Sequence, residues 1–281
     1  MLNADTIQSS RLIDDGYFVC KNILTRSFLS RIRSVVARLQ QSASPGPSAT
    51  HRAQGEMRSA MADPLFANLI SWSPALDRLS SMGFENPTYT DGYIISKPPK
   101  SPQLFWHYDW FAWQDPGAYD AAPQQVFLMY YLTDTSITNG CLRVIPGSHH
   151  RHNVLHEHIG NPHSGMLSRA EDLDQLAFSM RPDEVDVPVR AGDLVIGDAR
   201  LLHAAHANKS TEWRTVITLW FQPNYASLSD RVKAQMVQKI QKIPTDWPIE
   251  ATTLVKALHP TYKGHAKPYV RDLYRKNPVT N

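Results

Sequence analysis

The stretch LFWHYDW (Leu104–Trp110) carries an imidazole and a carboxylate two residues apart within an apolar and aromatic run. In a β-strand, residues two apart point to the same face, so a strand here aims His107 and Asp109 at one point and turns Tyr108 away. One further imidazole completes a two-histidine, one-carboxylate set, which binds Fe(II) and leaves the opposite face of the ion open. The triplet alone is weak, because the chain contains 12 histidines, so its interpretation depends on the surrounding sequence.

Three blocks of sequence follow one another along the chain. The first is Lys97–Trp110, the second is Asn139–His149 (NGCLRVIPGSH), and the third consists of Gly192–Ile196, Leu202–Asn208 and Arg214. They resemble, in order, the segment with the first two iron ligands, the NGCL-x-x-x-PGSH segment and the distal histidine block of the phytanoyl-CoA dioxygenase family. The N-terminal segment Asp14–Val19 also resembles the N-terminal segment of this family, so the resemblance extends over most of the chain.

This resemblance implies a fold and a chemistry. The expected fold is mainly β, a double-stranded β-helix (a cupin-like jelly roll) with bracing N-terminal helices. The expected function is that of a non-haem Fe(II)- and 2-oxoglutarate-dependent dioxygenase. Such an enzyme uses O2 to hydroxylate an unactivated C–H bond of a small molecule and releases succinate and CO2. The metal ligands and catalytic residues implied are His107, Asp109 and His203, and Arg214 is the implied partner of the far carboxylate of 2-oxoglutarate.

Several neighbouring residues have two interpretations. Tyr93 lies on the strand that enters the His107 motif and either lines the cosubstrate pocket or is a core aromatic. Trp110 and Trp113 are candidates for the substrate pocket, or they are packing residues at the mouth of the barrel. His206 competes with His203 as third ligand, but the spacing to Asn208 and Arg214 favours His203.

Two other functions remain open. One is a metal-binding jelly roll without oxygenase activity, such as a sensor or a degenerate member. Such a protein would have the same fold but would not catalyse an oxidation. A zinc hydrolase on the same scaffold differs in its metal preference and in its independence of oxygen. Fold analogy alone does not choose among them.

The composition is that of an ordinary soluble globular domain. The 281 residues are 42% hydrophobic and 20% charged, which suits one domain spanning residues 1–281. The net charge of +3 is too small to indicate a nucleic-acid partner, and no apolar run is long enough for a membrane span. With two cysteines, Cys20 and Cys141, and no signal-peptide pattern, a cytoplasmic location is expected. The oligomeric state is left undetermined.

The expected elements follow from periodicity and turn residues. Helices are expected at 25–39, with Thr25 as N-cap, and at 64–81, where Pro74 divides the helix in two. A short helical turn and a strand are expected within 11–22. The other expected strands are 89–96, 125–133, 141–146, 186–189, 193–197 and 214–222.

Two segments are expected to be loops. Residues 40–55 are rich in Ser, Pro and Gly and predict a mobile loop. The insert at 151–180 lacks a strand pattern, and we interpret it as a lid over the substrate. The histidine-rich sequence from His149 to His163 is interpreted as an exposed loop, and Lys97 as a surface charge at a strand end.

Overall fold

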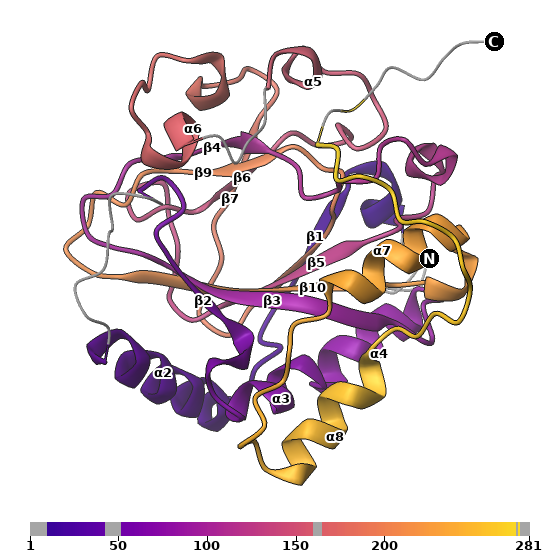
Figure 1. The fold of residues 1–281 in the computed structure, drawn as a ribbon. Helices are drawn as coiled ribbons and strands as arrows, with labels where there is room; N and C mark the ends of the chain where they lie inside the picture. Colours follow the sequence, from indigo (N-terminus) through magenta and orange to yellow (C-terminus); the bar gives the residue numbers. More distant parts are fainter. Residues whose placement is uncertain (1–9, 43–51, 160–164, 274, 276–281) are drawn as a thin grey trace, which may run out of the picture.

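Two antiparallel sheets face each other in the computed structural model, which describes residues 10–42, 52–159, 165–273 and 275 (Figure 1). The large sheet has the order β1 (Tyr17–Cys20), β8 (Leu194–Asp198), β5 (Val126–Tyr131), β10 (Arg214–Gln222), β3 (Thr88–Lys97) and β2 (Glu56–Ser59). The small sheet has the order β4 (Leu104–His107), β9 (His203–Ala205), β6 (Leu142–Val144) and β7 (Val185–Val187). Two facing antiparallel sheets with covering helices agree with the expected jelly roll, but the chain is less purely β than expected.

The strand β5 contributes side chains to two hydrophobic cores, one on each face of the large sheet. All six of its residues are buried. Alternate residues of a strand point to opposite faces. Leu128 and Tyr130 pack into the core on the helix side of the large sheet. Phe127 and Met129 pack into the core between the two sheets, together with Leu142 of the small sheet.

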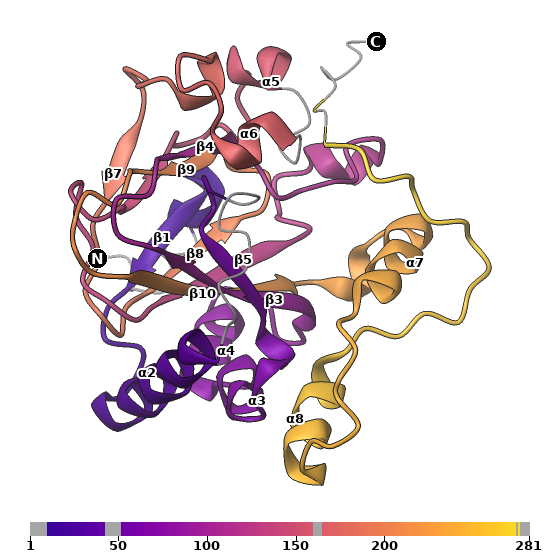
Figure 2. The ribbon, with the colours of Figure 1, turned by 60° about the vertical axis from the view of Figure 1, so that its left-hand side comes forward.

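Helices cover the outer face of the large sheet. Figures 1 and 2 both show α2 (Arg26–Gln41), α3 (Leu65–Ile70) and α4 (Ser73–Ser81) on this side. The predicted helix at 25–39 buries one apolar face, which consists of Phe28, Leu29, Ile32 and Val36. The Thr25 side chain accepts a hydrogen bond from Phe28 N at 3.2 Å, which confirms the predicted N-cap. The predicted break at Pro74 is also confirmed, because the proline lies in the first turn of α4.

Two helices after the last strand were not expected. They are α7 (Asp230–Lys239), which begins after the N-cap Ser229, and α8 (Ile249–Leu258). The α8 helix lies on the same side of the large sheet as α3 (Figure 1). The prediction of bracing helices only at the N-terminus was therefore too narrow.

The strand that carries the His-x-Asp triplet is shorter than expected. β4 ends at His107, and beyond it the backbone N–H groups of Asp109 and Trp110 both donate to the carbonyl oxygen of Ala199 at 2.8 Å. The expectation that Asp109 lies on a strand was wrong, because the backbone turns toward Ala199 instead of continuing the ladder. Two short strands, β2 and β9, were not predicted either.

The insert at 151–180 forms short helices over the small sheet (Figure 2). They are α5 (Leu155–His158), α6 (Gly165–Arg169) and the 3-10 turn η3 (Leu176–Phe178). Further 3-10 turns are η1 (Ala60–Ala62), η2 (Pro116–Tyr119) and η4 (Tyr225–Ser227). Residues 160–164 of the insert and 43–51 of the predicted mobile loop lie outside the described residues, and the lid role stays a prediction.

Burial corrects two expectations. Lys97 is 0% exposed rather than a surface charge, and its Nζ donates to the carbonyl oxygens of Ala53 and Pro102, both at 2.6 Å. His149 and His156 are also buried, although an exposed loop was expected. Both cysteines are buried and free. Among the described residues, no helix has the length and apolarity needed to cross a membrane.

Candidate metal centre

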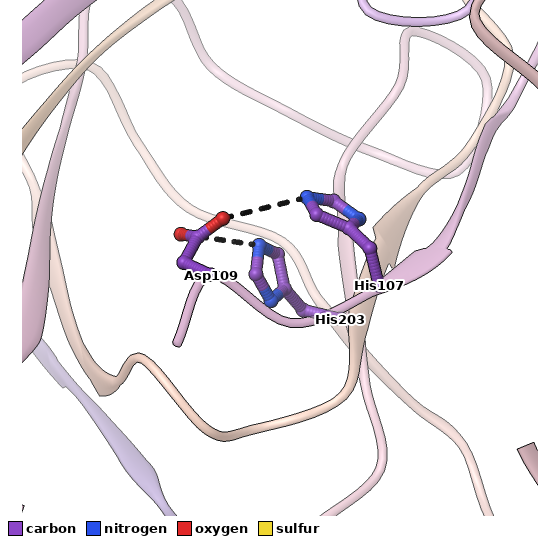
Figure 3. Close-up of side chains that lie close together, drawn as sticks. All are labelled: His107, Asp109 and His203. Carbon is purple, nitrogen blue, oxygen red and sulfur yellow. Dashed lines mark ion pairs between the residues drawn. The ribbon is translucent and has the colours of Figure 1, made fainter. Parts of the chain in front are cut away.

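His107, Asp109 and His203 lie together between the sheets (Figure 3). One carboxylate oxygen of Asp109 is 3.8 Å from His107 Nε2, and the other is 3.8 Å from His203 Nε2. One ligand atom from each residue can be chosen so that all three lie within 4.8 Å of one another. The strand register creates this geometry, because His107 on β4 is directly paired with His203 on β9.

Both imidazoles are fixed in the same tautomer. His107 Nδ1 lies 3.0 Å from the carbonyl oxygen of Phe105, and His203 Nδ1 lies 3.0 Å from that of Leu201. A carbonyl oxygen only accepts hydrogen bonds, so each Nδ1 carries the proton. Each Nε2 therefore keeps its lone pair and points toward Asp109, as a metal-binding histidine requires.

The carboxylate is held by a tryptophan from the facing sheet. Trp220 Nε1 donates to Asp109 Oδ2 at 2.9 Å. Burial alone would raise the pKa of Asp109, but the positive charge on His203 and His107 when these rings are protonated, together with the Trp220 hydrogen bond, outweighs burial and lowers the pKa. The carboxyl group is therefore held as the anion.

Arg214 lies at the start of β10, paired with Lys97 on β3. Its side chain is buried, and its Nε has no hydrogen-bond partner. None of the salt bridges formed among the described residues involves Arg214. Burial and the charge of Arg214 lower the pKa of Lys97, whose Nζ is already bound to two carbonyls. Arg214 is thus a buried cation with an Nε donor that remains for an anion.

Gly140 makes room beside this guanidinium. A Cβ atom at Gly140 would lie 3.4 Å from Arg214 Nε and 3.5 Å from Lys97 Cδ, and the φ of +90° favours glycine in any case. The glycine of the NGCL segment therefore lets the backbone approach the two basic side chains closely.

The inner face of β10 links Arg214 to the triad. Alternate residues of this strand share a face, which places Thr218 and Trp220 on the same side as Arg214. Thr218 Oγ1 is buried without a partner. Thr218 and Trp220 were not predicted as site residues, although the two-residue period counted from Arg214 was a signal that pointed to them.

Tyr93 shares this inner face but does not reach the carboxylate directly. It is paired with Thr218 and packs edge-on against Trp220 at 6.0 Å between ring centroids. Trp220 in turn contacts Asp109. Tyr93 therefore lies one side chain away from the triad.

Trp110 and Trp113 belong to a buried aromatic cluster on the other side of the ligand-bearing loop. Trp113 packs edge-on against Tyr108 at 5.0 Å between ring centroids. The Tyr108 hydroxyl contacts the carbonyl of Leu273 and accepts from Arg275 N. Tyr108 is thus turned away from the triad, as the two-residue alternation predicts. The contacts of Trp113 are those of a packing residue, and the substrate-pocket role of both tryptophans stays a prediction.

Lys239, at the end of α7, was also missed. Its Nζ lies 4.0 Å from the centroid of the Phe111 ring and 3.8 Å from Asp91 Oδ2, and its charge contributes to the lowered pKa of Asp109. No sequence signal pointed to Lys239, because α7 itself was not predicted.

His206 does not join the triad. Its Nε2 lies 2.6 Å from Asp186 Oδ1, in a separate group. The choice of His203 over His206 therefore agrees with the geometry.

Similarity to known proteins covers most of the chain. The family model described as Phytanoyl-CoA dioxygenase (PhyH) matches residues 13–216. Phytanoyl-CoA dioxygenase 1 of Oryza sativa subsp. japonica is 28% identical over 162 residues, which are 56% of this chain and 52% of the relative. A phytanoyl-CoA dioxygenase domain-containing protein 1 homolog of Dictyostelium discoideum is 30% identical over 98 residues, 34% of this chain and 33% of the relative. The chain spans about half the length of the first of these relatives.

Solved structures share the fold at low sequence identity. The epimerase SnoN, in complex with Fe3+, alpha ketoglutarate and nogalamycin RO, has a TM-score of 0.58 at 19% identity, covering 78% of this chain and 83% of SnoN. HygX from Streptomyces hygroscopicus, with nickel and 2-oxoglutarate bound, has a TM-score of 0.58 at 22% identity, covering 79% and 87%.

The family match extends from the end of the helical turn before β1 to the start of β10. It includes all three residues of the triad and Arg214, and the fold agrees with the structural neighbours. The chain belongs to the phytanoyl-CoA dioxygenase family.

Proposed function

We propose that this protein is an Fe(II)- and 2-oxoglutarate-dependent oxygenase that hydroxylates an unactivated C–H bond of a small molecule. The observation that carries the proposal is the convergence of two imidazole nitrogens and one carboxylate oxygen, all within 4.8 Å of one another, between the two sheets. Membership in the family supports the reaction class. Bound Fe(II) would supply oxygen activation, with 2-oxoglutarate leaving as succinate and CO2.

The donor set fits Fe(II). Two neutral imidazoles and one carboxylate from His107, His203 and Asp109 would occupy one face of the ion and leave the other for exogenous ligands. The carbonyls of Phe105 and Leu201 hold the rings, and Trp220 holds the carboxylate. Such supporting hydrogen bonds fix the direction of each ligand.

Arg214 would hold the far carboxylate of 2-oxoglutarate. A buried guanidinium with an unpaired Nε has lost its water without gaining a partner, which is costly unless a ligand supplies the anion. Guanidinium and carboxylate can pair through two parallel hydrogen bonds. Phe127, Val216 and Trp220, whose side chains face the space between the sheets, would exclude water from the site.

The partner in this proposal is a small-molecule substrate, and the compartment is the cytoplasm. Two free and buried cysteines suit a reducing compartment. Hydroxylation is the proposed outcome because the carboxylate of Asp109 takes the ligand position that a halide would need in a halogenation.

Substitution of Arg214 tests the cosubstrate. In Arg214→Ala the Kd for 2-oxoglutarate is expected to rise about 10- to 100-fold, since hydrogen bonds to charged groups contribute about 1.5–3 kcal/mol. Arg214→Lys should recover only part of this affinity, because an ammonium cannot pair bidentately. The measurement is anaerobic calorimetry of the Fe(II)-loaded protein, with Arg31→Ala on the exposed face of α2 as the matched control.

The same preparations separate the alternatives. Succinate formation that depends on O2 supports an oxygenase. Binding of Fe(II) and 2-oxoglutarate without succinate would indicate a sensor. An unchanged Kd in Arg214→Ala would remove this residue from the cosubstrate site.

A further inference from the structure

A second group of metal-ligand side chains lies outside the triad. Cys141, Asp186 and His206 can each offer one ligand atom such that the three atoms lie within 4.8 Å of one another. His206 Nε2 and Asp186 Oδ1 are already 2.6 Å apart. A thiol, an imidazole and a carboxylate are the three side-chain groups that bind zinc in proteins.

The strand register places this group on the outer face of the small sheet. Arg143 on β6 is paired with Asp186 on β7 and with Ala204 on β9. Cys141 precedes Arg143 by two residues and His206 follows Ala204 by two. By the two-residue alternation, all three candidate ligands share the face of Arg143. His203, one residue from Ala204, points to the opposite face and into the triad.

Burial gives this group the character of a built site. Cys141 is 0% exposed. The side chains of His206 and Asp186 are 10% and 34% exposed, so the group opens to solvent on the Asp186 side. Arg143, which shares this face, is engaged by Glu184.

We propose that Cys141, Asp186 and His206 form a second metal site for one thiophilic divalent cation of the zinc class. Three protein ligands leave a fourth position for water in a tetrahedral site, and the exposed side of Asp186 provides access for it. A bound ion would connect the end of β9 to β7 and to the residue preceding β6, and would therefore brace the strand that carries His203.

The chemistry of Cys141 selects the kind of cation. A cysteine binds a metal as the thiolate, so an incoming ion must displace the thiol proton of Cys141. Zn²⁺, Co²⁺ and Cd²⁺ bind thiolate strongly enough to do so. Mg²⁺ and Ca²⁺ prefer oxygen ligands and are expected to leave this group unoccupied.

Cobalt titration of the full chain tests the proposal. Co²⁺ bound to a thiolate gives a near-ultraviolet charge-transfer band, and the triad contains no sulfur. Under anaerobic, reducing conditions the wild-type protein is expected to develop this band as the second group fills, with up to two equivalents of Co²⁺ bound per chain because the triad also binds Co²⁺. The band should persist in Cys20→Ser and in His203→Gln, which leave the second group intact, and disappear in Cys141→Ser.

Two less buried substitutions keep the test independent of folding at Cys141. Loss of a group that merely orients a metal ligand costs about 10- to 100-fold in affinity, so His206→Gln and Asp186→Asn are expected to weaken Co²⁺ binding by about 100-fold or more. Absence of the band in the wild-type protein, or its persistence in Cys141→Ser, would reduce the group to a hydrogen-bonded His–Asp pair beside a buried thiol. Equal Co²⁺ affinity in wild type and His206→Gln would overturn the assignment of His206.

Discussion

Each imidazole of the triad donates to the carbonyl oxygen two residues before it, and this repeated contact fixes the lone pair at Nε2. The carboxylate is fixed differently, by Trp220 from the opposite sheet. The two histidines are therefore oriented within their own strands, whereas Asp109 depends on packing between the sheets. Of the three candidate ligands, we therefore expect the carboxylate to be the most sensitive to distant substitutions.

Trp220→Phe tests this dependence. Phenylalanine keeps the aromatic packing against Tyr93 but removes the hydrogen bond to Asp109. The Kd for Fe(II), measured anaerobically, is expected to rise about 10- to 100-fold, as for other residues that orient a metal ligand. Trp213→Phe, at a residue that is 37% exposed, is the matched control. Equal affinities in the two variants would show that Asp109 needs no help from Trp220.

At the residue scale, the sequence predicted the chemical groups better than their supports. His107, Asp109 and His203 were identifiable because the metal demands these residue types near a recognisable motif. Trp220 and Lys239 were not, because a tryptophan in a strand or a lysine in a helix has many ordinary roles. Only the pairing of distant strands brings them to the site.

At the scale of elements, the packing of a phenylalanine ring from β5 explains why β8 has a glycine at position 197. Gly197 is paired with Phe127, and a Cβ there would lie 2.2 Å from the Phe127 ring. The ring therefore occupies the space above the glycine, and its centroid lies 5.1 Å from that of His203. A missing side chain on β8 thus makes room for the ring that packs against a candidate ligand.

The N-cap of α2 gives an element-scale prediction. Thr25→Ala removes the acceptor for Phe28 N and is expected to lower the free energy of unfolding by about 1 kcal/mol. Urea unfolding monitored by circular dichroism measures the loss. Ser34→Ala, in the middle of the same helix and exposed, should change stability much less. A similar loss in both variants would argue against a capping role.

Elements were predictable where their pattern is strong. α2 has a continuous apolar stripe, and β5 and β10 are rich in β-branched and aromatic residues. β9 consists of His-Ala-Ala, which has low strand propensity, and forms because its neighbours supply the pairing. α8 buries only Ala251 and Val255, so it lacks a stripe that sequence periodicity could reveal.

At the scale of the whole molecule, the core that the helices cover and the candidate metal centre lie on opposite sides of the large sheet. The core beneath the large sheet is built from the helices and contains no residue of the triad. The triad lies between the sheets, where His203 packs against Phe127. The facing sheets could be predicted from the sequence through the family resemblance, whereas the C-terminal helices lay outside its motifs.

Buried histidines make the stability of the molecule depend on pH. Burial lowers the pKa of His149 from 6.5 to about 4, and that of His156 to about 3. Unfolding therefore takes up protons in the interval below pH 6.5, so the contribution of the neutral rings is complete above pH 6.5 and is lost as the pH falls toward 4.

The free energy of unfolding is expected to be lower at pH 5 than at pH 7, with about 2 kcal/mol of the difference due to His149. Urea unfolding at the two pH values measures it. His149→Gln should reduce the difference, whereas His265→Gln, at an exposed position, should not. If both variants retained the full pH dependence, the neutral state of His149 would not contribute to it.

The proposed oxygenase function requires that His107, Asp109 and His203 bind Fe(II) and that 2-oxoglutarate binds beside it. Anaerobic titration of the metal-free protein with Fe(II) and 2-oxoglutarate, followed by visible absorption, tests it most directly. We expect a weak charge-transfer band that fades when O2 is admitted, with formation of succinate. The band should be absent in His203→Gln and present in His206→Gln. Absence of the band in the wild-type protein, with tight zinc binding in its place, would contradict the oxygenase assignment.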